Sequence, residues 1–424
     1  MDTAPGLTRL VHQVRNVALG DRTGYSDGVL TVSAQEAASL VASPALAAVR
    51  VAWVSPGDSA RIVKVLDAVE PRAKGPGEEG MFPGLLGPVE GAGTGRTHVL
   101  RGVAVVAAGF LPRAQEAVVD MSGPAAPLSP LGVTHNLVVE FDPAEGAAWE
   151  DVDEALRRGV LTLAAHLAAT AVDSPPDSVD ELPPVGAGGD GDGLPRVGAI
   201  TNLQTQGTFK DVFVLGKSFT GQAPMFLDPN LLDDGAVVSG QFGHPSLKNP
   251  TWVHQNHPVV AALRARHGRD LSFAGLVISP EPVNQGQKEE VSKEVARLCA
   301  EAGWDAAVVT KEGGGNADAD MALKMDALED LGLTAVGLFA EMAGADGTGP
   351  SVVVPPERAT AMVSTGNYDE RLTLPAVDVA LGGAELALLG VPSTAELQLP
   401  AAVVYCSLSP LGWGRLTCAE EVAP

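Results

Sequence analysis

The sequence predicts an α/β protein in which a β-rich N-terminal domain precedes a doubly wound, mostly parallel sheet. Two patterns lead to this prediction. Up to residue 148, short runs that alternate apolar and polar side chains are separated by glycine-rich turns, which is typical of β-strands. After residue 195, short apolar runs alternate with longer segments whose apolar residues recur every three or four positions. That second pattern indicates strands connected by helices, and such strands pair in parallel.

The length of the chain and its charge limit the partners that it can have. With 424 residues, it is long enough for two or three domains. It carries 52 acidic and 28 basic side chains, which give a net charge of −24. Because this much negative charge repels phosphate groups, we expect neither nucleic acid nor an anionic membrane surface as a partner.

The cysteines and the N-terminus predict a cytoplasmic protein. Cys299, Cys406 and Cys418 are too few and too scattered for a disulfide framework or a CxxC metal site. The first residues include an acid and a proline where a signal peptide needs basic and then apolar side chains. The longest apolar stretches, 102–111 and 159–172, are too short to span a bilayer.

The first domain is expected to cover residues 1–148, and its alternating pattern predicts several strands. They are expected at residues 28–33, 49–54, 99–107 and 137–141. A glycine-rich segment, 82–98, precedes the third strand and can bring backbone amides close to an anion. It is not the G-x-G-x-x-G dinucleotide fingerprint, because its glycines fall at 91, 93 and 95.

Residues 149–195 are expected to join the two domains. Apolar residues recur at helical spacing from 149 to 172. The stretch from 173 to 195 is rich in Pro, Gly and Asp, which favours a flexible linker or an exposed loop. We therefore expect a helix followed by a linker, and the clearest domain boundary lies there.

Residues 196–345 are expected to form the doubly wound domain. Its strands are predicted at 197–201, 237–240, 273–279, 306–310 and 334–339, and its helices at 258–267, 288–302 and 318–331. Ligands of such sheets bind beyond the carboxyl ends of the strands. The corresponding loops are 202–210, 239–257, 280–287 and 311–318. The remaining residues, 346–424, are expected to form an extension that packs on this domain.

The segment between residues 310 and 320 follows a buried strand and opens a helix. One interpretation is helix capping, with Asn316 as N-cap and with Asp318 and Asp320 in the first turn, where negative charge is favourable. The other is a binding loop, in which free glycine amides, Glu312 and the two aspartates hold a polar or cationic ligand. Both interpretations can hold at once.

Three histidines lie close together on one predicted loop. His244, His254 and His257 could hold a zinc ion with an open position for water. Their spacing matches no established metal motif, however, and isolated histidines are more often hydrogen-bonded structural groups. His257 also precedes Pro258, so it could simply shape the entry into the following helix.

Two other kinds of active site find no support in the sequence. Residues 215–218 end like a phosphate-binding P-loop, but Asp211 occupies the position of the motif's first glycine. No G-x-S-x-G elbow is present, and Cys299 falls inside a predicted amphipathic helix, where we expect it to be buried and inert. A nucleophilic hydrolase is therefore not expected.

Many segments of the chain resemble, in order, one known family. They include Leu203-Gln-Thr-Gln-Gly207, Lys248-Asn-Pro-Thr251, the run from Glu312 to Asp320, and further blocks at 62–72, 82–84, 95–100, 120–124, 136–139, 234–240, 267–270 and 363–367. The chain resembles the proprotein subunit of component B of glycine, sarcosine and betaine reductases, a family related to the D-proline reductase proprotein. The resemblance runs over nearly the whole chain.

The resemblance implies the substrate-binding subunit of a two-protein reductase. In that family the proprotein cuts itself before a cysteine, which becomes an N-terminal pyruvoyl group. The pyruvoyl carbonyl captures the substrate amine as a Schiff base and weakens the bond between the α-carbon and nitrogen. A partner subunit then attacks this carbon with a thiol or selenol, which leads to reductive C–N cleavage.

This sequence departs from the family at the position that is cut. Where the family has Asn or Thr followed by Cys, this chain has Gln241 and Phe242. Phe242 has no nucleophile that could start an acyl shift. Ser246 could do so in principle, but it lies four residues out of register and follows Pro245. We therefore predict an uncleaved chain with no pyruvoyl group and no other cofactor.

Three hypotheses remain for the function. In the first, the chain pairs with a thiol- or selenol-bearing reductase subunit in a hetero-oligomer and binds a small amine that needs no Schiff base, with His244 and His254 as acid, base or metal ligands. The expected substrate-binding residues are Gln204, Gln206, Gln241, Asn256, Glu312, Asn316, Asp318 and Asp320. In the second, the chain is a non-catalytic scaffold or regulatory binder. In the third, it is a repurposed biosynthetic enzyme that uses His244, with or without zinc.

Overall fold

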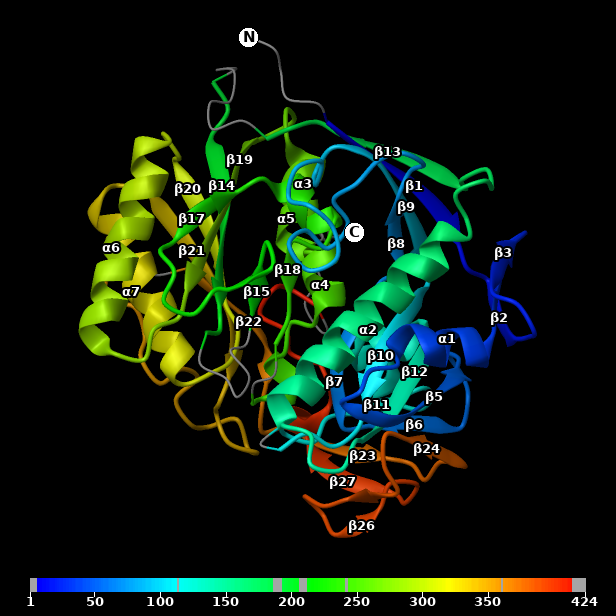
Figure 1. The fold of residues 1–424 in the computed structure, drawn as a ribbon. Helices are drawn as coiled ribbons and strands as arrows, with labels where there is room; N and C mark the ends of the chain where they lie inside the picture. Colours follow the sequence, from blue (N-terminus) through cyan, green and yellow to red (C-terminus); the bar gives the residue numbers. More distant parts are fainter. Residues whose placement is uncertain are drawn as a thin grey trace, which may run out of the picture.

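The computed structural model describes residues 6–112, 114–185, 193–205, 212–240, 243–359 and 361–413. The fold is mixed α/β, as the sequence predicts, and contains one large, mostly parallel sheet. In Figure 1 this sheet and its helices lie on the left, the N-terminal strands lie on the right, and the short helices α4 (Thr251–Gln255) and α5 (Pro258–Arg266) lie between them.

The N-terminal half contains two four-stranded sheets. The first has the order β13-β1-β9-β8, with β1 at Leu7–Gln13, β8 at Arg72–Lys74, β9 at Gly95–Arg101 and β13 at Ser178–Leu182. The second has the order β5-β12-β10-β7, with β5 at Leu46–Val54, β7 at Val65–Val69, β10 at Val103–Ala108 and β12 at His135–Pro143. A small sheet of β2 (Asn16–Leu19), β3 (Gly24–Ser26) and β4 (Val29–Val32) lies beside them.

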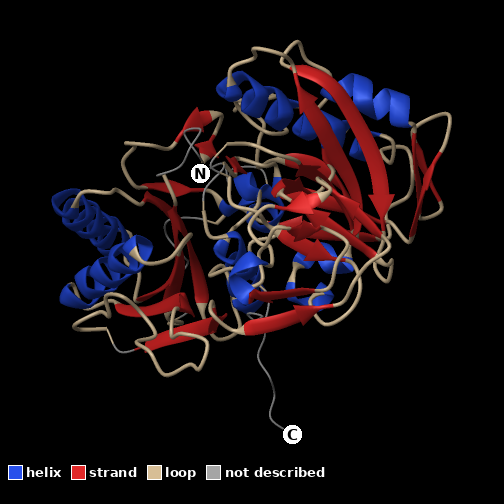
Figure 2. Cartoon of the chain, turned by 90° about the horizontal axis from the view of Figure 1, so that it is seen from below, coloured by secondary structure: helices blue, strands red, loops and turns tan. Residues whose placement is uncertain are grey.

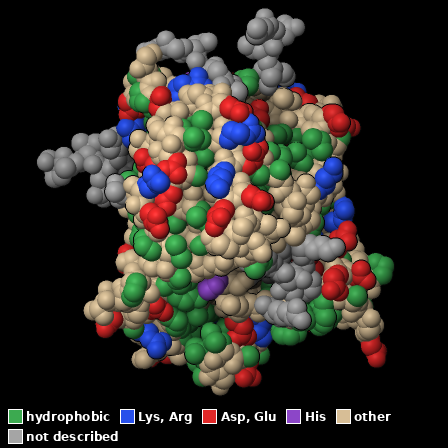
Figure 3. All heavy atoms as spheres, turned by 90° about the vertical axis from the view of Figure 1, so that its left-hand side faces the viewer, with side chains coloured by type: hydrophobic (Ala, Val, Ile, Leu, Met, Phe, Trp, Pro, Cys, Tyr) green, Lys and Arg blue, Asp and Glu red, His purple; other side chains and the backbone are tan. Residues whose placement is uncertain are grey.

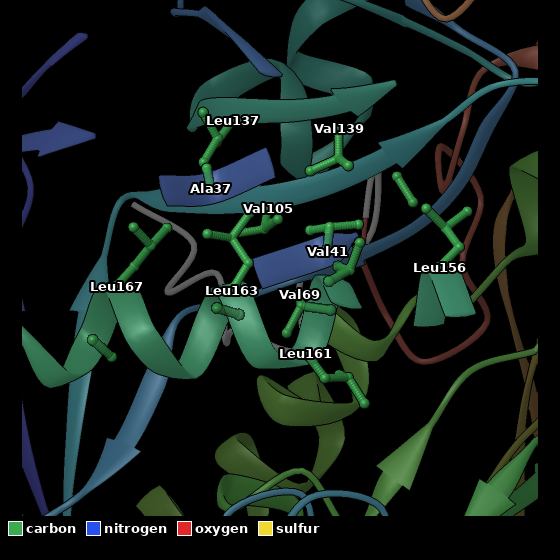
Figure 4. Close-up of a cluster of buried hydrophobic side chains, with 14 of the residues drawn as sticks. Ala37, Val41, Val69, Val105, Leu137, Val139, Leu156, Leu161, Leu163 and Leu167 are labelled. Carbon is green, nitrogen blue, oxygen red and sulfur yellow. The ribbon is translucent and has the colours of Figure 1, made fainter. Parts of the chain in front are cut away.

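Helix α2 (Trp149–Ala169) covers one face of the second sheet together with α1 (Ala34–Val41). Leu156, Leu163 and Leu167 recur at helical spacing and point toward the sheet, where they meet Val105 and Leu137 (Figure 4). These side chains are buried, so this contact is the hydrophobic core of the N-terminal half. Figure 4 also shows Ala37 and Val41 from α1 in the same cluster.

The run from 99 to 107, which the sequence indicated as one strand, forms parts of two strands. Gly102 has φ +89°, a conformation that favours glycine, and turns the chain between β9 and β10. Strand β9 pairs with β1, whereas β10 pairs with β12. Both strands are buried and apolar, so their side-chain pattern alone did not reveal the break.

Part of the predicted linker belongs to a sheet. Residues 178–182, inside the segment expected to be flexible, form β13, which pairs antiparallel with β1. Asp180 on β13 also forms an ion pair with Arg9 on β1. Backbone hydrogen bonds therefore fix a segment whose composition favoured a loop. The rest of the linker includes 186–192, which lie outside the described residues.

The large sheet has the order β17-β19-β14-β20-β21-β22, and only β17 is antiparallel to its neighbour. Its strands are β14 (Arg196–Leu203), β17 (Met225–Leu227), β19 (Ser272–Pro280), β20 (Ala306–Thr310), β21 (Thr334–Glu341) and β22 (Ala361–Asn367). Small elements precede β19: β15 (Phe213–Val214), β16 (Lys217–Ser218), α3 (Pro229–Asp233) and β18 (Val237–Val238).

Helices pack on both faces of this sheet. Helix α5 packs on one face, where Ala199 belongs to the core cluster. Helices α6 (Gln285–Glu301) and α7 (Asn316–Asp330) pack on the other, where Ile200 is buried. They lie outside the strands, at the left edge in Figure 2. Because consecutive residues of β14 are buried on opposite faces, Ala199 and Ile200 in its middle are both apolar.

The first residue of helix α7 differs from the prediction, whereas the burial of Cys299 on helix α6 agrees with it. The N-cap of α7 is Gly315 and not Asn316: Gly315 takes φ +69°, and its N–H donates to the Asp318 carboxylate at 3.1 Å. Cys299 on α6 is fully buried, as predicted, and burial raises the pKa of its thiol to about 12. It is therefore an inert core residue.

The C-terminal residues contact both halves of the molecule. Strand β22 extends the large sheet, but β24 (Val379–Leu381) pairs with β6 (Ala60–Val63), which also pairs with β11 (Val118–Asp120). The expectation placed this extension on the α/β part alone. Two antiparallel strand pairs complete this extension. Strand β23 (Arg371–Leu374) pairs with β27 (Leu397–Pro400), and β25 (Glu385–Leu386) pairs with β26 (Val391–Pro392).

No helix in the described part of the chain combines the length and the apolar character that crossing a bilayer requires.

Candidate functional site

The candidate site lies at the carboxyl ends of β14, β19 and β20. Strand β14 has β19 on one side and β20 on the other, so the chain leaves β14 and returns on both sides of it. Ligands of open parallel sheets bind at such a point. The residues that follow the three strands are Gln204, Glu281, and Lys311 with Glu312.

Glu312 is at the centre of this group and is fully buried. Its Oε1 lies 3.1 Å from Nε2 of His254 on α4, and its Oε2 accepts a hydrogen bond of 2.7 Å from the N–H of Gln204. The N–H of Glu312 itself donates to Oε1 of Glu281 at 3.4 Å. The structure therefore brings together Gln204, His254 and Glu312, three of the residues that the sequence indicated.

Lys311 and Asp318 form a second buried pair beside Glu312. The Lys311 Nζ lies 2.6 Å from Asp318 Oδ1 and donates to the carbonyl of Gly313 at 2.8 Å. The other Asp318 oxygen accepts from the N–H of Gly315. Asp318 therefore caps α7 and neutralises a lysine, so the capping interpretation describes it better than the interpretation as a ligand for a cation.

A third group surrounds Asp320, deeper in α7. Asp320 forms an ion pair with Lys288 from α6 and lies 3.7 Å from Lys324 Nζ. Burial raises the pKa of Asp320 although both lysines oppose this, and burial lowers the pKa of Lys324. Burial also raises the pKa of Glu281 well above its usual range, and the charges of Asp320 and Glu312 raise it further.

These buried ionisable groups form one cluster, which we call the charged cluster. Its members are His254, Glu281, Lys288, Lys311, Glu312, Asp318, Asp320 and Lys324, and each is at most 2% exposed. Removing so many charges from water costs free energy that apolar side chains would not cost. Such clusters with perturbed pKa values concentrate at functional sites.

Asn202, near the end of β14, is completely buried, and neither polar atom of its side chain has a hydrogen-bond partner among the described residues. A buried amide without partners is rare, because each unmade hydrogen bond costs free energy. Its place at the same edge of the sheet as Glu312 makes it a polar group available to a ligand.

Side-chain hydrogen bonds fix the chain before and after residues 241 and 242, where the sequence differs from the family it resembles. Before it, the carbonyl of Gly240 accepts a hydrogen bond from Lys248 Nζ. After it, Thr251 donates its N–H and its hydroxyl to Asp67, at 2.9 and 2.7 Å. Asn249 donates to the carbonyl of Lys311 at 3.1 Å and so connects this loop to the charged cluster. Gln206, Gln241 and Phe242 lie outside the described residues.

His244 lies between this loop and an apolar cavity. Its Nδ1 is 3.1 Å from the Tyr368 hydroxyl, and its N–H donates to Gln115 Oε1 at 2.9 Å. Tyr368 and Gln115 line a cavity of about 630 Å³, together with Leu66, Leu111, Ala402 and Val403. Burial lowers the pKa of His244, and the charge of Lys311 lowers it further, so its neutral form is favoured.

The surface of the α/β half is mixed in character. Figure 3 shows acidic and basic side chains interspersed on its upper part and hydrophobic side chains gathered around a histidine below them.

The three histidines have separate hydrogen-bond partners in the structure. Nε2 of His257 lies 2.8 Å from the Thr201 hydroxyl, and its Nδ1 accepts from the N–H of Val260, so it caps α5. His254 faces Glu312, and His244 faces Tyr368. In the ranges that the structure describes, no three His, Cys, Asp or Glu side chains are placed to share a metal ion.

Two of the expected substrate-binding residues have other surroundings. The Asn256 side chain accepts from Arg72 at 2.9 Å and donates to Glu70, and both partners belong to the N-terminal half. It joins the two halves of the chain and does not face Glu312. Asn316 is exposed at the start of α7, and its carbonyl accepts from Lys288 at 3.3 Å.

Sequence reasoning missed the lysines and Glu281. Lys311 and Glu281 directly follow strands that were predicted correctly, so the rule about carboxyl ends could have identified them. Lys288 and Lys324 lie on helices, and lysine there is usually solvated. Only the packing of α6 against α7 shows that they are buried.

Comparison with known proteins agrees with the resemblance drawn from the sequence. The family model described as "Glycine/sarcosine/betaine reductase component B subunits" matches residues 7–395. The glycine reductase complex component B subunits alpha and beta of Peptoclostridium acidaminophilum are 37% identical over 373 residues, which cover 87% of each chain. No solved structure gives a significant match.

Two further relatives from the same organism carry names with other substrates. The sarcosine reductase complex component B subunit alpha is 34% identical over 373 residues, again 87% of each chain. The betaine reductase complex component B subunit alpha is 31% identical over 434 residues, which cover 96% of this chain and 98% of the relative.

Proposed function

Because the chain belongs to the family of glycine, sarcosine and betaine reductase component B subunits, we propose that it is the substrate-binding subunit of a related reductase complex. It acts on an amine or amino-acid derivative. It works as one uncleaved chain without a pyruvoyl group. Its partner is a subunit that carries a reactive thiol or selenol, and the two form a hetero-oligomer in the cytoplasm.

The observation that carries this proposal is the side chain at position 242. Self-cleavage requires an Oγ or Sγ atom to attack the preceding carbonyl, and Phe242 has neither. Ser246 is a poor substitute, because it is fully buried and its hydroxyl has no hydrogen-bond partner among the described residues. No side chain in the described part of the chain is therefore placed as a base to activate it.

Without a pyruvoyl group, the substrate must be held by charge and hydrogen bonds. Glu312 is a buried carboxylate whose two oxygens already contact His254 and the N–H of Gln204, so its position is fixed. A fixed carboxylate in a dry site attracts a cationic amine strongly. Asn202 offers an amide that has no partner among the described residues and can bond a polar group of the substrate.

The proposed reaction divides the work between two proteins. The partner's thiolate or selenolate forms a bond to the carbon beside nitrogen, and the amine leaves with the electron pair of the broken bond. His254, within hydrogen-bond distance of Glu312, can hold or move a proton in the site. His244 is favoured in its neutral form and can accept a proton near Tyr368.

The experiment is a reconstitution with the thiol- or selenol-bearing subunit encoded beside this chain. We expect the two proteins to co-purify and to release an amine from a quaternary or tertiary amino-acid derivative. Glu312→Gln should lower the rate by about 100-fold, because it removes the charge that holds the substrate. Glu294→Gln, an exposed glutamate on α6, is the matched control and should keep full activity.

Two results would contradict the proposal. If the subunits associate but Glu312→Gln turns over as fast as the original chain, the charged cluster is not the substrate site. If no association occurs at any ratio, the chain does not belong to a reductase complex. Association without any turnover would favour the scaffold hypothesis instead.

A further inference from the structure

A second cavity, of about 540 Å³, lies on the opposite side of α4 from Glu312. We call it the arginine cavity, because Arg9, Arg101 and Arg264 line it. Arg9 and Arg101 belong to β1 and β9 of the N-terminal half, whereas Arg264 belongs to α5. The cavity therefore lies where the two halves meet, near α4 and α5 in the middle of Figure 1.

The ion pairs at this cavity leave an excess of guanidinium groups. Arg9, Arg101, Arg264 and the buried Arg72 are paired with only three carboxylates, Glu70, Asp180 and Asp233. Asp180 is partly exposed and, among the described residues, forms an ion pair with Arg9 only. The next carboxylate, Asp228, caps α3 through Asn230 and forms no ion pair with them in the described structure. This local excess of positive charge occurs in a chain of net charge −24.

Asp233 and Glu70 are charged in this network. Burial alone would raise the pKa of Asp233, but Arg72, Arg9 and Arg264 overcome it and lower the pKa. Arg101 and Arg72 do the same for Glu70. Since both acids are ionised, the count of charges above holds at neutral pH.

Several N–H donors at the cavity have no acceptor among the described residues. Nε of Arg9 and Nε1 of Trp252 are buried and make no hydrogen bond to any described residue. Nε of Arg101 is 3.1 Å from Glu70 but is not aligned for a hydrogen bond. Donors without acceptors are costly when buried, and an anionic ligand would satisfy them.

The walls of the cavity are apolar and partly flat. The rings of Trp252 and Trp413 meet edge to face with centroids 5.4 Å apart, and Pro130 and Val133 extend the apolar surface. The volume is sufficient for a small organic molecule. Charge therefore gathers around an apolar pocket, which a bare ion would leave mostly empty.

We propose that the arginine cavity binds an organic anion, a carboxylate or phosphate carried on a flat apolar group. The anionic group contacts Arg9, Arg101 and Arg264, and the apolar group packs against Trp252 and Trp413. This site is separate from the charged cluster, because Trp252 and Gln255 of α4 line the cavity whereas His254 contacts Glu312. Its occupancy does not depend on the proposed reductase activity.

The test is direct binding by the full chain, measured by isothermal titration at fixed ionic strength. The probes are benzoate and phenyl phosphate as organic anions, benzamide as a neutral analogue, and inorganic phosphate as a bare anion. We expect at least one organic anion to bind saturably and at least tenfold more tightly than benzamide and inorganic phosphate. The fluorescence of the tryptophans should change at the same concentrations.

Two variants locate the binding. Arg264→Gln and Arg101→Gln should each weaken binding about tenfold, because each removes a charge–charge contact to the ligand. Arg266→Gln, two residues further along α5 and paired with Asp270 outside the cavity, is the matched control and should bind as the original chain does.

The comparison of benzoate with benzamide uses only the original chain, so it stands even if a variant does not fold. Equal affinity for these two probes, or no saturable binding of either organic anion, would overturn the proposal. Inorganic phosphate that binds as tightly as phenyl phosphate would overturn the assignment of an organic ligand. Folded variants at Arg264 and Arg101 that bind normally would overturn the location.

Discussion

Single side chains decide which chemistry this chain can perform. Phe242 offers no atom that could attack a carbonyl, whereas Lys248 still holds the carbonyl of Gly240 two residues before it. Under the proposed function, the side chain of Phe242 is the reason why the chain stays whole. Glu312 and His254, by contrast, keep a polar pair in a site that burial makes costly.

The two lysines near Asp320 allow a test of how the charged cluster is stabilised. Lys288 donates to both Asp320 and the carbonyl of Asn316, whereas Lys324 Nζ lies 3.7 Å from Asp320 and makes no hydrogen bond to a described residue. We expect Lys288→Met to lower the free energy of unfolding by about 3 kcal/mol, because Asp320 loses its bonded partner. Lys324→Met should lower it by less, because Lys324 Nζ lies 3.7 Å from Asp320 Oδ1 and the burial of its own charge is costly.

Urea unfolding at pH 7 measures both variants. Equal losses for Lys288→Met and Lys324→Met would show that simple charge balance, and not hydrogen bonding, stabilises Asp320.

His257 predicts a pH dependence of stability. Burial lowers its pKa from 6.5 in a solvated histidine to about 3, and His254 contributes to this. The unfolded chain therefore takes up a proton at this residue below pH 6.5 and the folded chain does not, so its contribution is complete above pH 6.5 and is lost as the pH falls toward 3. We expect wild-type stability to fall by about 1.4 kcal/mol per pH unit at this residue.

The variant His257→Asn isolates this contribution, since asparagine also caps helices. The stability advantage of the original chain over His257→Asn at pH 7 should shrink as the pH falls from 6 to 4. His166→Asn, at an exposed position on α2, is the control. Parallel curves for His257→Asn and the original chain would contradict the burial of a neutral imidazole.

At the scale of residues, the sequence located part of the site. Glu312 and His254 were indicated because they follow or face predicted strand ends, and strand ends are readable from apolar runs. The pairing of Asp318 with Lys311, and the burial of Lys288, depend on how α6 packs on α7. A side chain that is charged in the sequence gives no sign that tertiary packing will bury it.

Among the elements, β14 has the central place. It lies between β19 and β20 in the large sheet. It contains Asn202, and Gln204 directly follows it. Its position depends on the close packing of Trp304 over Gly198, where an added Cβ would lie 2.1 to 2.4 Å from ring atoms. Such distances leave no room for any side chain.

Gly198→Ala should therefore lower the free energy of unfolding by about 2 to 3 kcal/mol, because Trp304 or β14 must shift. Gly24→Ala is the control, since nothing lies within 4 Å of its added Cβ. Thermal or urea unfolding measures both. A Gly198→Ala variant as stable as Gly24→Ala would show that Trp304 can move without cost.

Element positions were predictable where one pattern dominates. Strand β20 and helices α5 and α6 fall close to the predicted ranges, because buried parallel strands and amphipathic helices have distinct periodicities. The break at Gly102 and the strand β13 were not predicted. The first lies inside a continuous apolar run, and the second is an edge strand whose pairing with β1 depends on contacts distant in the sequence.

At the scale of the whole molecule, charged residues hold the two halves together. Arg72 connects Glu70 of the N-terminal half with Asp233 and Asn256 of the other half. The arginine cavity lies along this junction and is lined by Trp252 of α4, whereas His254 of the same helix contacts Glu312. A composition of 52 acidic and 28 basic residues gave no indication that arginines would concentrate there.

The intact mass of the purified chain tests the central claim most directly. The account predicts a single species at the mass of the whole chain, 43.3 kDa, which does not react with a hydrazide reagent for ketones. Two fragments, of which one carries a hydrazide-reactive N-terminus, would show that the chain cuts itself and forms a pyruvoyl group despite Phe242, and would contradict the proposed function.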